Sequence, residues 1–222
     1  MNDGVKHPPL QNFFMSLLYA YVQTCYKGKD FNHAPHAGAD FLSLANCKAV
    51  IREVQELDNG NWVIGLLSVR NRRRRVSYLG RIDEVIDRAV YFKRFSEKRL
   101  DNFYIPSEGG FLWLANPFHK ENGIGHKSDM ASRNVLLSHT FFKPDTDVVL
   151  PRAFDFVEES LRPLHGARGH RKFAVPDQQM RELLKQLIHA ASQLSPVRKS
   201  DGEVGGKGVT CGSAFPQATG CA

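Results

Sequence analysis

The sequence has few cysteines and no long apolar run, and these two absences narrow the class of protein. Its four cysteines are Cys25, Cys47, Cys211 and Cys221. They are widely spaced and include no C-x-x-C pair, which argues against a disulfide framework and for a reducing environment. No segment has the roughly 18 consecutive apolar residues of a membrane span, and the first residues lack the pattern of a secretory signal. We therefore expect a soluble, cytoplasmic protein with no membrane partner.

Recognisable catalytic motifs are also missing. There is no G-x-S-x-G elbow, and the glycine-rich segments 108–110 and 123–125 lack the Lys-Ser/Thr that follows a phosphate-binding loop. Cys25 and Cys47 lie inside segments of periodic apolar character, where a thiol is usually an inert core residue. These absences favour a protein that is not an enzyme.

Metal ligands come closest together in the segment His33-x-x-His36-x-x-x-Asp40. The spacing matches no compact zinc pattern, and Pro35 prevents a helix from placing the two histidines on one face. We therefore expect neither a bound metal nor another cofactor.

Positive charge is concentrated in one stretch of the chain. Arg70 to Arg99 contains eleven basic and four acidic residues, a net charge of +7, which equals the net charge of all 222 residues. A local imbalance of this size gives one surface a field of one sign and favours a polyanionic partner.

Five arginines lie within six positions at the start of this stretch, and arginine pairs with phosphate through two parallel hydrogen bonds. If they continue a strand, alternate guanidinium groups project from opposite faces and can straddle a nucleic-acid backbone. Later basic residues extend the surface, and a tyrosine beside them can stack on a base. The predicted contact residues are Arg70, Arg72, Arg73, Arg74, Arg75, Tyr78, Arg81, Arg88 and Arg99. The alternative is a solvated face with local ion pairs such as Glu84 with Arg88.

A second basic group follows near the C-terminal end. It consists of Arg168, His170, Arg171 and Lys172, between glycines. We interpret it as a polar surface loop, with a second phosphate contact as the alternative.

Apolar spacing and turn residues predict the secondary structure. The expected helices span 10–25, 79–100, a short stretch after Pro151 and a long one after Pro176; the expected strands span 49–57, 62–69, 111–115 and 135–142, with a hairpin turn at Asp58-Asn59-Gly60. This order predicts an α+β fold in which a small antiparallel sheet packs with four or five amphipathic helices.

We expect a single domain over residues 1–195. The glycine-rich tail 196–222 has almost no large apolar residues and is expected to be disordered.

The leading hypothesis is a nucleic-acid-binding accessory protein, more specifically a DNA-binding one, that contacts the phosphate backbone through its arginine-rich segment. Two alternatives remain open. The first is a metal-dependent phosphodiesterase or nuclease that uses the same surface, and the second is an interaction module for an acidic protein partner.

Overall fold

The structure is a computed structural model, and it describes residues 14–23, 35–38, 40–54, 60–70, 73–95, 99, 101–114, 127, 129–164 and 169–194. The tail that the sequence predicts to be disordered lies outside these residues. Among them the labelled helices are α1 (Ala49–Glu53), α2 (Arg88–Phe95), α4 (Asp155–Leu161) and α5 (Asp177–Leu194); the 3-10 turns η3 (Arg152–Phe154) and η4 (Arg162–Leu164) flank α4.

The largest sheet has five strands in the order β10–β5–β4–β1–β11. Their bounds are β1 (Met15–Val22), β4 (Trp62–Arg70), β5 (Arg73–Arg81), β10 (Phe141–Phe142) and β11 (His170–Pro176). Strands β1 and β4 run parallel, and the other neighbours run antiparallel. The strand β11 therefore lies at one edge of this sheet.

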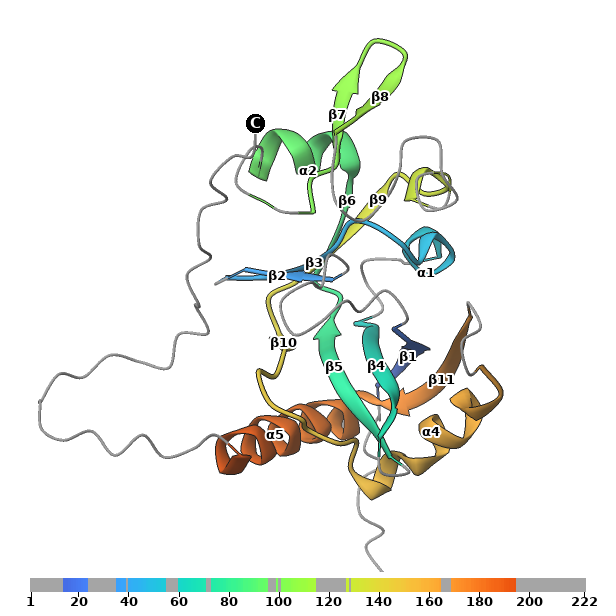
Figure 1. Cartoon of the computed structure of the whole chain (residues 1–222), viewed down its shortest axis with the longest axis vertical. Coiled ribbons are helices and arrows are strands. Elements are labelled where there is room, and N and C mark those ends of the chain that lie inside the picture. The colour runs from blue at the N-terminus through green and yellow to red at the C-terminus, as the bar shows by residue number, and fades with distance from the viewer. Residues whose placement is uncertain are drawn as a thin grey trace, which may run out of the picture.

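The other strands form two smaller sheets. A four-stranded sheet has the order β2–β3–β9–β6, and β7 and β8 form a two-stranded hairpin that projects from the rest of the molecule (Figure 1). The bounds are β2 (His36–Ala37), β3 (Leu42–Leu44), β6 (Glu84–Asp87), β7 (Tyr104–Ser107), β8 (Gly110–Trp113) and β9 (Asn134–Ser138).

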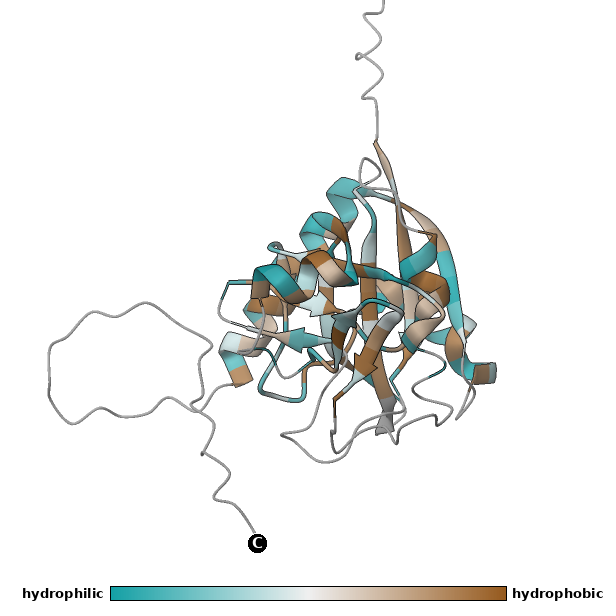
Figure 2. Ribbon diagram, turned by 90° about the horizontal axis from the view of Figure 1, so that it is seen from above, coloured by the Kyte–Doolittle hydropathy of each residue, from teal (hydrophilic) through white to brown (hydrophobic). Residues whose placement is uncertain are grey.

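Both faces of the five-stranded sheet are buried, and this determines where the core lies. Alternate residues of β1, such as Leu18 and Ala20, pack with α4 and α5, whereas Tyr19 and Tyr21 pack toward β3, β9 and α1. Figure 2 shows apolar residues along the central strands and polar residues along the outer helix faces. The molecule is thus a layer of helices, a central sheet and a second, smaller sheet.

The predicted fold class is wrong in its proportions. Among the described residues the strands account for 40% and the helices for 34%, distributed over three sheets and only four helices. The expectation of one small sheet packed with four or five amphipathic helices failed mainly because two segments with helical spacing are strands.

The first of these segments is 10–25, where the described part forms β1. A strand that is buried on both faces is a nearly continuous apolar run, and such a run also satisfies helical spacing. The second segment is 79–100, in which β5 ends at Arg81 and β6 follows; of its described residues, only Arg88–Phe95 are helical.

The opposite error occurs at 49–57, where the predicted strand begins as the short helix α1. The hairpin therefore lies one connection later, because Arg70 of β4 is paired with Arg73 of β5. The strand over 62–69 and the two helices after Pro151 and Pro176 are confirmed. The predicted strand 135–142 is divided between β9 and β10, which belong to different sheets.

Candidate functional site

The arginine run lies at the end of the β4–β5 hairpin, and its described members contact acidic residues that are distant in the sequence. The guanidinium of Arg73 lies 2.6 Å from Asp155 Oδ1. Arg75 forms an ion pair with Asp147. Arg74 points to the opposite side, is 1% exposed, and donates through Nη2 to the carbonyl of Leu161 at 3.2 Å. Arg72 and the side chain of Arg70 lie outside the described residues.

The other predicted contact residues are also engaged within the protein. Tyr78 is buried and donates its hydroxyl hydrogen to Tyr21 Oη at 2.8 Å. Arg88 is buried over the ring of Tyr104, 4.8 Å from its centre. Arg99 lies over the ring of Phe41 and donates to the hydroxyl of Tyr91 at 2.9 Å. The structure thus brings Tyr78, Arg88 and Arg99 into its interior rather than along one outer face.

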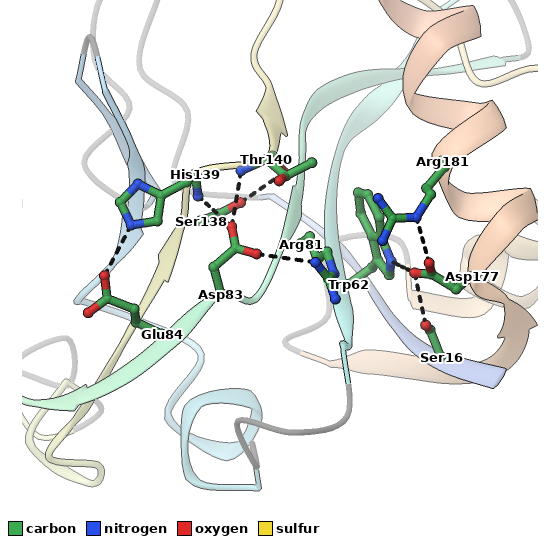
Figure 3. Close-up of polar contacts among 10 residues, drawn as sticks. All are labelled: Ser16, Trp62, Arg81, Asp83, Glu84, Ser138, His139, Thr140, Asp177 and Arg181. Atoms are coloured by element: carbon green, nitrogen blue, oxygen red, sulfur yellow. Dashed lines mark hydrogen bonds and ion pairs between the residues drawn. The ribbon is translucent and has the colours of Figure 1, made fainter. Parts of the chain in front are cut away.

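Arg81 ends β5 beside Asp83, whose carboxylate connects the two larger sheets (Figure 3). Its Nη1 lies 3.7 Å from Asp83 Oδ1, while Asp83 Oδ2 accepts hydrogen bonds from the backbone amides of His139 and Thr140 at 2.6 and 3.0 Å. Figure 3 also shows Asp177, which accepts the indole N–H of Trp62 at 3.1 Å. The contacts of Asp83 join the end of β5 to residues 139–140 and account for the position of Arg81. The contact of Asp177 joins α5 to β4.

The predicted metal ligands do not gather in the described part of the chain. His33 lies outside it, and no group of three metal-ligating side chains occurs among the described residues. His36 belongs to β2, where burial lowers the pKa of its imidazole to about 4, and Asp40 is exposed.

A different cluster has the features of a functional site, and it centres on Cys47 and Lys48 at the start of α1. Both residues have left-handed backbone conformations, with φ values of 58° and 49°, and they are the non-glycine residues with positive φ among the described ones. Such conformations are uncommon for side-chain-bearing residues and are often found at functional sites. Cys47 is partly exposed.

Two buried groups hold this backbone in place. The amide of Cys47 donates to Asp129 Oδ1, and Asp129 Oδ2 accepts the hydroxyl hydrogen of Tyr104 at 3.0 Å. Arg52 donates through Nε to the carbonyl of Cys47 at 2.9 Å. Burial and then the nearby guanidinium of Arg88 lower the pKa of Arg52 to about 10, so Arg52 stays protonated at neutral pH.

Two tyrosines of the large sheet, Tyr21 and Tyr78, lie beside this cluster. The ammonium of Lys48 lies 4.0 Å from the ring centre of Tyr21, a distance typical of a cation–π contact. Tyr21 is hydrogen-bonded to Tyr78, and Gly65 lies opposite Tyr78 on β4. A Cβ atom on Gly65 would lie 2.3 Å from the Tyr78 ring, so only glycine leaves room for this tyrosine.

Basic residues of β11 lie on the same face of the sheet as this tyrosine pair. In the β1–β11 register His170 is opposite Tyr21 and Lys172 is opposite Tyr19, so all four side chains share one face. Burial and then the positive charges of Lys48, Arg171 and Lys172 lower the pKa of His170. We call Lys48, His170, Arg171 and Lys172 the basic patch; Arg171 is opposite Ala20 in the register and therefore projects from the other face of the edge strand β11. Among the described residues no carboxylate forms an ion pair with Arg171 or Lys172.

Sequence reasoning missed this cluster for identifiable reasons. Cys47 was interpreted as a core residue, and it does pack against the apolar cluster between the two larger sheets. Neither Lys48 nor Asp129 was singled out. The group 168–172 was interpreted as a surface loop, but residues 170–172 belong to an edge strand. The sequence offered no local signal for the turn, because the two left-handed residues are a cysteine and a lysine, which do not favour this conformation.

Comparison with known proteins gives one match. No curated protein and no solved structure matches the chain. Among the described residues, no helix is both long and apolar enough to span a membrane. A family model described as "nucleotide modification associated domain 2" matches residues 15–193, which include both larger sheets, the basic patch and the Cys47 cluster. The chain therefore belongs to the nucleotide modification associated domain 2 family.

Proposed function

We propose that this protein binds nucleic acid through the basic patch and that the bound nucleic acid meets the Cys47 cluster. The observation that carries the proposal is the position of Lys48, His170 and Lys172 beside one another on a single face of the sheet. Arg171 and Lys172 are exposed and have no carboxylate partner among the described residues, so they are available to phosphate groups. The family description supports a partner of this class, because it associates the family with nucleotide modification.

The proposal moves the main phosphate contacts away from the arginine run. Arg73 and Arg75 are ion-paired and Arg74 is buried, so these three have less to offer a phosphate than Arg171 and Lys172. Arg70 and Arg72 stay predicted contacts. We infer DNA as the nucleic acid and an accessory role in its handling, as the sequence hypothesis had it.

Replacement of Arg171 and Lys172 by glutamine is expected to weaken the binding of a mixed-sequence DNA duplex. Each lost phosphate contact lowers the slope of log affinity against log salt by about 0.9, so the slope should decrease by about 1 to 2 units. The affinity near 50–100 mM salt should fall about tenfold. Fluorescence anisotropy at several salt concentrations measures both quantities.

The matched control is Arg73→Gln combined with Arg75→Gln, which removes the same charge from another strand of the same sheet. This variant should keep the wild-type slope, since its arginines are paired with Asp155 and Asp147. The reverse result, a lower slope for the control alone, would place the contacts on the arginine run. If the wild-type protein does not bind at about 50 mM salt, the nucleic-acid proposal is wrong.

A second candidate function is thiol-dependent chemistry on the bound nucleotide, and the position of Cys47 favours it. Cys47 is partly exposed, its backbone is fixed by Asp129 and Arg52, and Lys48 follows it directly in the sequence. A thiolate beside cations is the usual form of a nucleophilic cysteine. A protein acting in this way is an enzyme, in contrast to the expectation from the sequence.

Cys47 is therefore expected to react faster with iodoacetate than with neutral iodoacetamide, relative to a simple thiol such as glutathione. The basic patch raises the local concentration of the anionic reagent, and the relative preference should be roughly three- to tenfold. Peptide mass spectrometry separates Cys47 from the other cysteines. The preference should disappear in the Arg171→Gln/Lys172→Gln variant, and a glutathione-like ratio in the wild type would remove the support for this candidate.

A further inference from the structure

The arginines of the β5 hairpin end face carboxylates that come from a separate part of the chain. Arg73 Nη2 lies 2.6 Å from Asp155 Oδ1, and its Nε lies 3.8 Å from Glu158 Oε2. Arg75 is paired with Asp147. The three acids belong to α4 and to the segment before it, more than 70 residues along the chain from the arginines. These pairs are therefore made by the tertiary fold rather than by neighbouring residues.

The side chains of Asp155 and Asp147 remain largely open to solvent. They are 51% and 56% exposed, and the side chains of Arg73 and Arg75 are 29% and 19% exposed. Ion pairs at such exposure contribute little to stability and are screened by salt. The carboxylates are thus replaceable without unfolding, and each can turn into solvent from its own backbone position.

The backbone that carries the acids is, in contrast, firmly anchored. Phe154, Val157 and Leu161 are buried in the core beneath α4. Val76 donates its amide to the carbonyl of Val148 at 2.8 Å, and Leu150 donates to the carbonyl of Arg74 at 3.3 Å. The acids are therefore held close to the arginines at a high effective concentration, where they compete with any external anion.

We propose that Arg73 and Arg75 form a second surface for a phosphodiester backbone, which Asp147, Asp155 and Glu158 keep occupied in the free protein. The carboxylates take the positions of phosphate oxygens, and they restrict phosphate contacts to the basic patch. This inference rests on the proposed nucleic-acid binding, but it concerns a different surface of the same molecule.

Neutralising the competing acids tests the proposal. The Asp147→Asn/Asp155→Asn variant should bind a DNA duplex about tenfold more tightly near 100 mM salt, and its salt slope should be steeper by about 1 to 2 units, because Arg75 loses its acidic partner and Arg73 keeps only Glu158, 3.8 Å away. The matched control is Glu108→Gln/Glu182→Gln, which changes the net charge equally at exposed positions on the β7–β8 turn and on α5. The control should keep the wild-type slope.

A combined variant separates a local effect from a general one. Adding Arg73→Gln and Arg75→Gln to Asp147→Asn/Asp155→Asn should return both the affinity and the slope to wild-type values. The proposal is overturned if the acid variant binds like the wild type, if the control gains as much, or if the combined variant keeps the gain. Thermal melts check that every variant is folded. The Arg171→Gln/Lys172→Gln variant tests binding through the basic patch in a separate measurement. An incorrect assignment of the basic patch and an incorrect assignment of the second surface therefore give different results.

Discussion

Replacement of Arg52 by methionine is expected to lower the free energy of unfolding by about 3–5 kcal/mol. The Arg52 side chain is fully buried, and its guanidinium donates to four backbone carbonyls, those of Cys47, Asp129, Ser132 and Asn134. Methionine fills a similar volume but leaves these carbonyls without their donor, and each unsatisfied buried acceptor costs about 1–3 kcal/mol. Urea denaturation at pH 7 measures the loss.

A comparison of variants separates this network from a general effect of losing an arginine. Arg94→Met removes an exposed arginine whose Nη1 lies 2.6 Å from Glu84, and it should cost no more than about 1 kcal/mol. Arg52→Lys keeps the positive charge but cannot reach four acceptors, so it should recover only part of the stability. A loss below about 1 kcal/mol for Arg52→Met would show that the carbonyls find other donors, and that Arg52 does not fix the Cys47 backbone.

The sequence predicts local structure well where one face of an element is exposed. The helix α5 has a clear apolar stripe, with Met180, Leu183 and Leu187 fully buried, and its start behind Pro176 marks it unambiguously. The strand β1 has no such contrast, because helices cover one of its faces and the smaller sheet covers the other. The two-residue alternation of a strand is therefore not visible in its sequence, and only the tertiary packing distinguishes β1 from a helix.

The arginine run illustrates a second limit of sequence reasoning. The sequence left open whether the run continues the strand over 62–69; instead Arg70 ends β4 and Arg73 begins β5, with Arg73 and Arg75 on one side and Arg74 on the other. Its lack of acids within a few residues was taken as a lack of acids altogether. The acids that pair with it arrive through α4, and no local pattern reports a partner at that separation.

Composition and residue spacing could not predict the Cys47 cluster either, because its members are far apart in the sequence. Its members come from α1, β1, β5, β11 and the 129–134 segment, and each is unremarkable in its own stretch of sequence. The feature that distinguishes them is the left-handed backbone of two consecutive residues, and backbone dihedral angles follow from the fold rather than from residue type alone.

Stability is expected to fall by about 2–3 kcal/mol between pH 7 and pH 4.5 through His36 alone. Burial first, then the positive charges of Arg99 and Lys143 against the opposing charge of Asp101, lowers the pKa of His36 from 6.5 to about 4. Below pH 6.5 the unfolded chain therefore binds a proton at this residue that the folded protein does not. Stability is fully present above pH 6.5 and is lost as the pH falls toward 4, at 1.36 kcal/mol for each unit of pKa difference.

The His36→Gln variant isolates this contribution, because acidic groups that titrate over the same range do so in both proteins and cancel in the difference. Urea denaturation at pH 7 and at pH 4.5 should show a smaller loss for His36→Gln than for the wild type, by about 2–3 kcal/mol. The matched control His189→Gln, on the exposed side of α5, should keep the wild-type dependence on pH. An equal decrease in the free energy of unfolding for His36→Gln and the wild type would contradict this prediction. It would mean that His36 is protonated in the folded protein at pH 4.5 and that its surroundings tolerate the positive charge.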